Sequence, residues 1–120
     1  MDETTTILET KEIVRKFCES RDWDQYHNAK DLAIGIITEA SELLEHFRFK
    51  SEKEVEKMLL DSNKKDKISE EMADIFYFLL RLAQRYDVDL ATVLEKKMKV
   101  NDEKYPIDKA KGSNKKYNEL

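Results

Sequence analysis

Two pairs of carboxylates stand out because their residue types and spacing could bind a metal ion. Glu39 and Glu42 form one pair, and Glu71 and Asp74 form the other. A three-residue spacing places both side chains of a pair on one face of a helix. Two apolar residues follow each pair. The alternative is a solvated helix face, because 40% of the residues are charged and similar acid pairs occur elsewhere in the chain.

The position of each pair relative to the apolar stripe of its helix favours the metal site. The two predicted stripes run through Ile36, Ala40, Leu43 and Phe47, and through Ile68, Met72, Ile75 and Leu79. The first acid of each pair lies roughly 60° from its stripe and the second roughly 120°, on the same side. If the helices pack antiparallel, stripe against stripe, we expect all four carboxylates to converge at one rim of the interface.

Four carboxylates at one rim would repel each other unless a cation lies among them. Oxygen ligands suit Mg²⁺ or Mn²⁺, and Mg²⁺ usually binds together with substrate phosphates. The pattern therefore predicts phosphate chemistry. A di-iron site is the metal-based alternative, but it needs Glu-x-x-His on facing helices, a pattern that this sequence lacks. His46 is either an outer partner of the acids or an ordinary rim residue.

The elements that position these residues are all predicted to be helices. The chain has only two glycines and one proline, too few for a protein with many turns. Apolar periodicity predicts helices at about 6–20, 31–49, 51–59, 66–86 and 90–104. Thr6, Ser51 and Asp89 are the expected N-caps. The segment from Arg21 is expected to be a loop that tucks Tyr26 into the core.

Composition limits the class of protein. The length of 120 residues predicts a single domain over residues 1–120, with a polar tail from about residue 107 that we expect to be mobile. The net charge of −4 argues against a nucleic-acid partner. A single cysteine, no apolar run of roughly 18 residues and no basic leader predict a cytoplasmic protein without a membrane partner. Wide apolar stripes on a short chain predict a homodimer or homotetramer.

Further motifs accompany the acid pairs. Lys97, Asn101 and Tyr105 recur every four residues, and Pro106 follows them. An Arg-Asp-Trp-acid-Gln-aromatic-His segment spans 21–27. In this order the motifs resemble the MazG-like nucleotide pyrophosphohydrolases of the all-α NTP pyrophosphatase superfamily, and most closely their dCTP pyrophosphatase branch. The resemblance extends over nearly the whole chain.

This resemblance implies a MazG-like helical bundle that is completed by oligomerisation. It also implies Mg²⁺-dependent hydrolysis of a nucleoside triphosphate, dCTP or a related one, to the monophosphate and pyrophosphate, with the four acids as metal ligands and catalytic residues. Such a reaction cleans the nucleotide pool. The residues that it implies for nucleotide binding are Trp23, His27, Phe49, Lys97, Asn101 and Tyr105. Their types fit, because an indole can stack on a base and lysine can neutralise phosphate.

Three positions depart from the family pattern, and one of them is His46, which stands where an apolar residue is expected. Phe49 stands where a tryptophan is expected, and Val14 where a histidine is expected, which bears on cytosine selectivity more than on the chemistry. Two other functions remain as alternatives. One is a non-enzymatic helical oligomer, such as an adaptor, in which the acid pairs are ordinary surface. The other is the same fold acting on a phosphoribosyl nucleotide intermediate.

Overall fold

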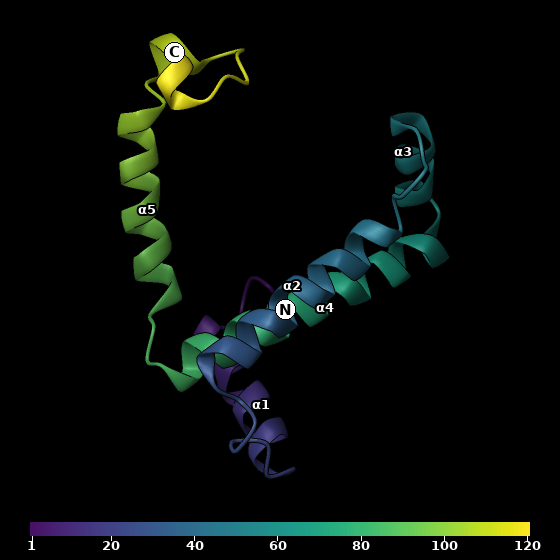
Figure 1. The fold of residues 1–120 in the computed structure, drawn as a ribbon, viewed down its shortest axis with the longest axis vertical. Coiled ribbons are helices and arrows are strands. Elements are labelled where there is room, and N and C mark those ends of the chain that lie inside the picture. Colours follow the sequence, from purple (N-terminus) through teal and green to yellow (C-terminus); the bar gives the residue numbers. More distant parts are fainter. The chain divides into compact units, whose positions relative to one another are not determined.

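The computed structural model describes residues 1–120 and contains helices but no strands, which confirms the predicted all-α class. The chain divides into two compact units, Met1–Asp87 and Val88–Leu120. The single domain predicted for the whole chain stays a prediction. The first unit contains α1 (Ile7–Glu19), α2 (Ala29–Glu45), α3 (Glu52–Leu60) and α4 (Ser62–Arg85) (Figure 1).

A polar side chain caps the start of each long helix. Thr6, Ser51 and Asp89 each accept a hydrogen bond from the backbone N–H three residues later, as predicted. Asn28 and Asp61 do the same for α2 and α4, and these two caps were not predicted. Each cap satisfies one of the backbone N–H groups that a helix start leaves unpaired.

Two helix boundaries differ from the prediction. α2 ends at Glu45 instead of near Phe49, and Phe49 itself has a φ of 61°, a left-handed conformation that a right-handed helix cannot continue through. α4 begins at Ser62 instead of near Asp66, because Asp61 caps it there. The stretch expected to connect two helices is therefore the first turn of α4.

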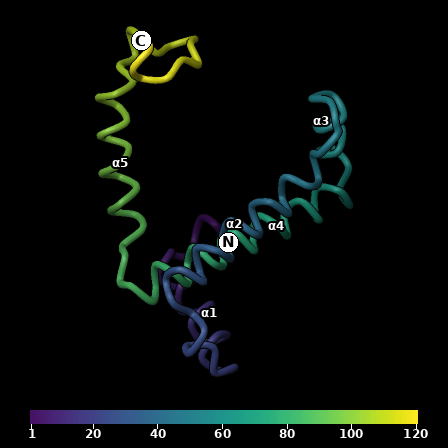
Figure 2. The backbone as a smooth tube through the Cα atoms, in the orientation of Figure 1, coloured from purple at the N-terminus to yellow at the C-terminus, as the bar shows by residue number.

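α2 and α4 lie side by side and run in opposite directions (Figure 2). Their ends are joined by a hydrogen bond of 2.8 Å from the backbone N–H of Ala29 to the hydroxyl of Tyr86. Near the other end of the pair, His46 lies 3.4 Å from Glu71. The pair thus has the antiparallel arrangement that the convergence of the acids requires.

The contact face of these two helices is rotated from the predicted stripes. The least exposed positions on α2 are Leu32, Gly35, Ile36, Glu39 and Leu43. On α4, Ile68, Leu80, Arg81 and Ala83 are buried, and Glu71, Ile75, Phe78 and Leu82 are among the half-buried positions. The stripe residues Ala40, Met72 and Leu79 are exposed instead, with Met72 at 57%. Both helices carry apolar residues on more than one side, so the stripe alone does not locate the buried face. The rotation places Glu39 and Glu71 within the contact face.

α1 packs against α4 through a small aromatic core. Cys18 is fully buried, and its sulfur lies 3.1 Å from the hydroxyl oxygen of Tyr77. The ring of Phe17 meets the ring of Tyr77 edge-on, with centroids 6.1 Å apart. These contacts bring α1 to the side of α4 that also carries Ala73 and Asp74.

The second unit contains α5 (Leu90–Lys104), α6 (Ile107–Ala110) and the 3₁₀ turn η1 (Tyr117–Glu119). The bounds of α5 agree with the predicted helix at 90–104. The two short elements in the polar tail were not predicted. The ring of Tyr117 packs against Tyr105, with centroids 6.2 Å apart, and the ammonium group of Lys104 lies 4.8 Å from the Tyr117 ring centroid. Nowhere in the chain does a helix have the length and apolar character that crossing a membrane requires.

Candidate active site

Three carboxylates come together between α2 and α4. Glu39 and Glu42 lie on α2 and Glu71 lies on α4, and one oxygen atom of each lies within 4.8 Å of the other two. One carboxylate oxygen of Glu39 and one of Glu71 are buried without a hydrogen-bond partner. Buried polar atoms are nearly always paired, so two unpaired carboxylate oxygens at one place indicate a site for a cation.

The electrostatics of this group support the same conclusion. Burial, followed by the contact with Glu42 and the charges of Asp74 and Glu71, raises the pKa of Glu39 to about 7. Without a cation, Glu39 is therefore partly protonated at neutral pH. A divalent cation would remove this penalty and satisfy both unpaired oxygens. The oxygen-only donor set fits Mg²⁺ or Mn²⁺.

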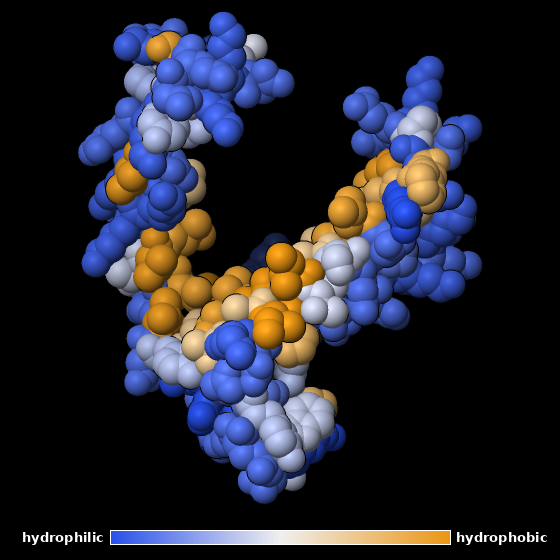
Figure 3. Space-filling model, in the orientation of Figure 1, coloured by the Kyte–Doolittle hydropathy of each residue, from blue (hydrophilic) through white to orange (hydrophobic).

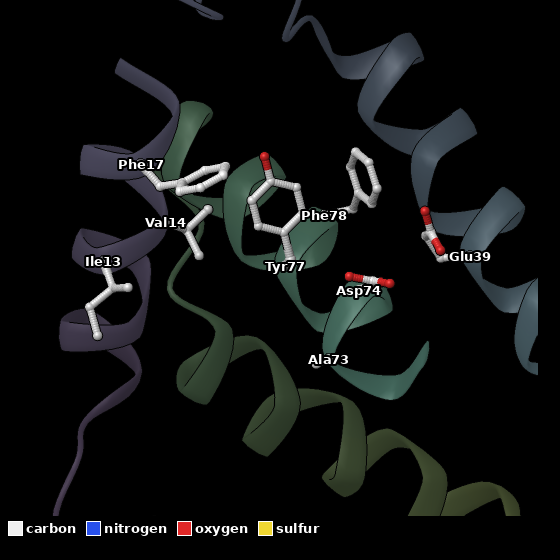
Figure 4. Close-up of a pocket in the computed structure, with 8 residues that line it drawn as sticks. All are labelled: Ile13, Val14, Phe17, Glu39, Ala73, Asp74, Tyr77 and Phe78. Atoms are coloured by element: carbon white, nitrogen blue, oxygen red, sulfur yellow. The ribbon is translucent and has the colours of Figure 1, made fainter. Parts of the chain in front are cut away.

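A cavity of about 520 Å³ adjoins the carboxylates. Its lining comes from α1, α2 and α4 and consists of Ile13, Val14, Phe17, Glu39, Ala73, Asp74, Tyr77 and Phe78. Figure 4 shows the α1 residues on one side, Glu39 on the other and the α4 residues between them. The volume is in the range of roughly 300–1,000 Å³ that is typical of small-molecule sites. Because Glu39 belongs both to the cavity and to the carboxylate group, a molecule in the cavity would lie beside the bound cation.

Asp74, the fourth predicted ligand, lies next to the group of three. It is exposed and lines the cavity together with Glu39. Its charge contributes to the raised pKa of Glu39, so the two carboxylates face a common region. The structure thus places all four acids on the facing helices, with three grouped tightly and Asp74 on the cavity side.

On another side of the group, His46 contacts Glu71. Its Nε2 atom lies 3.4 Å from Oε1 of Glu71. A second hollow, of about 300 Å³, is lined by these two residues with Glu42 and Glu45. His46 therefore occupies the position of an outer partner of the acids, one of its two sequence interpretations.

The sequence has counterparts among known proteins that match this architecture. The profile of the MazG-like family matches residues 34–120, most of the chain. The chain belongs to the MazG-like family. It is also 31% identical over 115 residues to dCTP pyrophosphatase 1 of Rattus norvegicus and of Homo sapiens, covering 96% of this chain and 68% of each relative. A crystal structure of a pyrophosphatase from Archaeoglobus fulgidus has a TM-score of 0.78 and 36% sequence identity, covering 83% of this chain and 92% of that chain.

These likenesses confirm the predicted enzyme class of this MazG-like protein, a nucleoside triphosphate pyrophosphohydrolase. The non-enzymatic alternative is thereby set aside. The family match spans both acid pairs, because residues 34–120 include Glu39, Glu42, Glu71 and Asp74.

The loop between α1 and α2 of this MazG-like protein holds Trp23 and His27 behind the cavity wall. Trp23 meets Phe17 edge-on with ring centroids 5.7 Å apart, and it meets His27 at 5.9 Å. Phe17 lines the cavity, whereas Trp23 and His27 do not. The expectation for Tyr26 was wrong: it is 61% exposed, because Trp23 is the aromatic residue that packs inward from this loop.

Sequence analysis missed one residue that organises this loop. Arg81 on α4 is fully buried and contacts Asp24, His27 and Gln84. Its position within the apolar run Leu79-Leu80-Arg81-Leu82-Ala83 was a usable signal, since a charged residue there must either reach the surface or find buried partners.

The other predicted nucleotide-binding residues lie farther along the chain. Phe49 follows α2, is 90% exposed, and has the guanidinium group of Arg48 4.6 Å from its ring centroid. Lys97 and Asn101 lie on α5 and Tyr105 ends it, all in the second unit. Asn101 is half-buried there, and Tyr105 packs on Tyr117.

Proposed function

We propose that this protein hydrolyses a deoxynucleoside triphosphate, dCTP or a close relative, to the monophosphate and pyrophosphate, and that it requires Mg²⁺, with Mn²⁺ as a substitute. The observation that carries the proposal is the joint position of Glu39 in an aromatic-lined cavity and in a carboxylate group with unpaired buried oxygens. The names of the dCTP pyrophosphatase relatives support the substrate. Removal of unwanted nucleotides from the cellular pool is the role that fits such a reaction.

The four acids would hold the metal ion. Glu39, Glu42 and Glu71 offer oxygen atoms that are already grouped, and Asp74 is next to them on the cavity side. A divalent cation bound there supplies Lewis-acid stabilisation of the charge on the phosphate oxygens. Phosphoryl transfer depends mainly on positioning and charge neutralisation, so no covalent nucleophile is needed.

The cavity would bind the nucleoside. The rings of Phe17, Tyr77 and Phe78 provide apolar surfaces against which a base can pack. The only charged residues of the lining are Glu39 and Asp74, and the phosphates would lie toward these two acids. Trp23 and His27 would support this wall from behind. Phe49, Lys97, Asn101 and Tyr105 are the further residues that we assign to nucleotide binding, with Lys97 and Asn101 toward the phosphates or the sugar.

The reaction itself needs a water molecule and a proton acceptor. Glu42 is the exposed member of the group of three, so water reaches it most easily, and we assign it the role of general base. The water oxygen forms a bond to the α-phosphorus as its proton passes to the carboxylate. The bond from the α-phosphorus to the bridging oxygen breaks, and the electron pair leaves with pyrophosphate.

We also propose that the protein acts as a homodimer or homotetramer. Ile34, Ile37 and Leu44 on α2 are 51%, 69% and 66% exposed, and Met72 and Phe76 on α4 are similarly uncovered. Figure 3 shows apolar side chains gathered on the surface over α2 and α4. Isolated exposed apolar residues are normal, but a continuous surface of this kind is typical of an interface.

A substrate panel tests the proposed function directly. Ribo- and deoxyribonucleoside triphosphates, with a phosphoribosyl nucleotide as a separate arm, are incubated with the protein and Mg²⁺, and pyrophosphate release is measured. We expect release from deoxynucleoside triphosphates, greatest with dCTP or a related pyrimidine, and none when the metal is chelated. Turnover of the phosphoribosyl nucleotide alone would replace this proposal with the other substrate class. No pyrophosphate from any compound would refute it.

A further inference from the structure

A buried arginine on α4 lies outside both the cavity lining and the carboxylate group. Arg81 is 0% exposed and is the only charged residue among the buried ones. Burying a guanidinium group is strongly unfavourable unless acceptors pair with its N–H groups. The hydrogen-bond partners of Arg81 therefore indicate which part of the structure the buried guanidinium group holds in place.

Arg81 has three partners, and two of them lie in the loop between α1 and α2. Its Nε donates to Nδ1 of His27 at 2.9 Å, and its Nη1 donates to Oε1 of Gln84 at 2.6 Å. Its Nη2 pairs with the carboxylate of Asp24, which also lies 3.5 Å from Arg85. The planar fork of one arginine thus ties the loop that carries Trp23 to α4.

The contact with His27 fixes the chemical form of its ring. A ring nitrogen that accepts a hydrogen bond carries no proton, so the neutral ring must carry its proton on Nε2. A second proton would have to sit on Nδ1, directly against the guanidinium group. Burial and the charges of Arg81 and Arg85 lower the pKa of His27, against the opposing effect of Asp24.

Ring contacts connect this arginine cluster to the cavity. The imidazole of His27 meets the indole of Trp23, Trp23 meets Phe17, and Phe17 forms part of the cavity wall. Each of these contacts is edge-on, so the position of one ring limits the position of the next. Displacing His27 would loosen the support behind Phe17.

We propose that Arg81 is a positioning residue, which holds His27 as the neutral Nε2–H tautomer and, through Trp23, preorganises the Phe17 wall of the cavity for the nucleoside. The nucleoside part of this inference rests on the proposed function, because it takes the cavity as the nucleoside site. The tautomer part depends on neither metal nor nucleotide.

The wild-type protein allows a first test by NMR of ¹⁵N-labelled imidazole rings. The chain has only two histidines, so the His46→Gln variant assigns the spectrum. We expect His27 to show an unprotonated Nδ1 and a protonated Nε2 at neutral pH, in the absence of metal and nucleotide. A protonated Nδ1, in either the other tautomer or the imidazolium, would overturn the inference without any variant having to fold.

The second test separates positioning from a purely structural role. Arg81→Met removes the donors while keeping an apolar chain. Arg81→Lys keeps the charge but replaces the planar fork, whose three nitrogens each contact a different partner, by a single nitrogen. In both variants we expect loss of the fixed tautomer and a KM for nucleotide raised roughly 2- to 30-fold, the range for residues that act through others, with kcat changed less than about twofold. Arg85→Met is the matched control for the NMR measurement, because Arg85 contacts Asp24 and the backbone oxygen of His27 but not the ring.

The possible failures point to different parts of the inference. A normal KM in an Arg81→Met protein that releases pyrophosphate normally would refute the positioning role and leave the proposed function intact. Full rescue by Arg81→Lys would mean that only the buried charge matters and would also refute it. Absence of pyrophosphate release from the wild-type protein would refute the proposed function. It would also refute the role of Arg81 in nucleoside binding, but it would not affect the test of the His27 tautomer.

Discussion

Glu39 belongs to both halves of the candidate site, because it lines the cavity and groups with Glu42 and Glu71. Replacing it by glutamine keeps its size and removes the charge that a cation needs. We expect Glu39→Gln and Asp74→Asn to lower kcat/KM by roughly 100-fold or more. Mutation of residues that only orient the metal ligands commonly lowers metal affinity or activity by about 10- to 100-fold, and loss of a ligand itself should cost at least as much. Circular dichroism should show unchanged helical content.

Glu70→Gln is the matched control for this comparison. Glu70 precedes Glu71 on α4 and is exposed, outside the group of three acids and the cavity lining. Its variant should retain normal kcat/KM. Near-normal turnover in Glu39→Gln or Asp74→Asn would show that the acids are not the metal site.

The raised pKa of Glu39 predicts an unusual dependence of stability on pH. Its pKa is 4.5 in an unperturbed chain and about 7 here, because of burial and the nearby acids Glu42, Asp74 and Glu71. Between pH 4.5 and about 7 the folded state therefore binds more protons than the unfolded state. The stability that Glu39 contributes is fully present below pH 4.5 and is lost as the pH rises through about 7. We expect the Tm of the metal-free protein to fall between about pH 5 and pH 8.

Two comparisons isolate the contribution of Glu39. The Glu39→Gln variant should show a smaller fall in Tm over the same range, because glutamine does not titrate. Mg²⁺ should raise the Tm of the wild-type protein more at pH 8 than at pH 6, since it competes with the proton for the same oxygens. A metal-free Tm that rises with pH, equally in both proteins, would contradict the assigned pKa.

At the scale of helices, most of the fold could be predicted from the sequence. Apolar periodicity and the caps at Thr6, Ser51 and Asp89 located every long helix. The rotation of α2 against α4 could not be predicted, because both helices have apolar residues on several sides and the true contact face includes charged residues. Glu39 and Glu71 lie within that face, whereas the stripe analysis placed them roughly 60° to its side.

The candidate site was predictable only in part, because its geometry depends on how the helices pack against one another. The acid pairs were recognisable by their spacing, since spacing along a helix is a local property. The cavity depends on Val14 and Phe17 meeting Tyr77 and Phe78 across two helices, and the Arg81 cluster joins residues more than 50 positions apart in the chain. Such contacts are set by tertiary packing and leave no regular pattern in the sequence.

Gly35 controls how closely α2 approaches α4. A methyl group added at this residue would lie 2.5 Å from ring atoms of Phe78. Alanine favours the helix by roughly 1 kcal/mol, whereas overpacking costs typically about 1–3 kcal/mol. Because Phe78 borders the cavity, its ring can relieve the clash by moving into that space.

We therefore expect Gly35→Ala to change Tm only modestly and to raise the KM for nucleotide by narrowing the cavity. Steady-state kinetics and a thermal melt measure the two effects. Ala33→Gly is the control for helix propensity alone, since Ala33 is exposed on the same helix. An unchanged KM in Gly35→Ala would show that Phe78 does not border the nucleotide site.

At the scale of the whole molecule, the uncovered apolar residues of α2 and α4 lead to the proposed homo-oligomer. We expect light scattering after size-exclusion chromatography to give the mass of two or four chains. Ile37→Glu should shift the protein toward the monomer with unchanged helical content, because Ile37 is 69% exposed within one chain and a buried charge would oppose association.

Leu60→Glu provides the comparison for this change. Leu60 is 87% exposed at the end of α3, away from the middle of α2, so its variant should keep the wild-type mass. A wild-type protein that is monomeric and fully active would contradict the proposal that the protein acts as a homodimer or homotetramer.

The central claim is that water attacks the α-phosphorus of a nucleoside triphosphate. Hydrolysis in ¹⁸O-labelled water, with mass spectrometry of both products, tests it most directly, because the label follows the phosphorus that is attacked. We predict one labelled oxygen in the nucleoside monophosphate and none in pyrophosphate. Label in pyrophosphate would place the attack at the β-phosphorus, and orthophosphate with a nucleoside diphosphate as the first products would place it at the γ-phosphorus. Either result would contradict the proposed reaction.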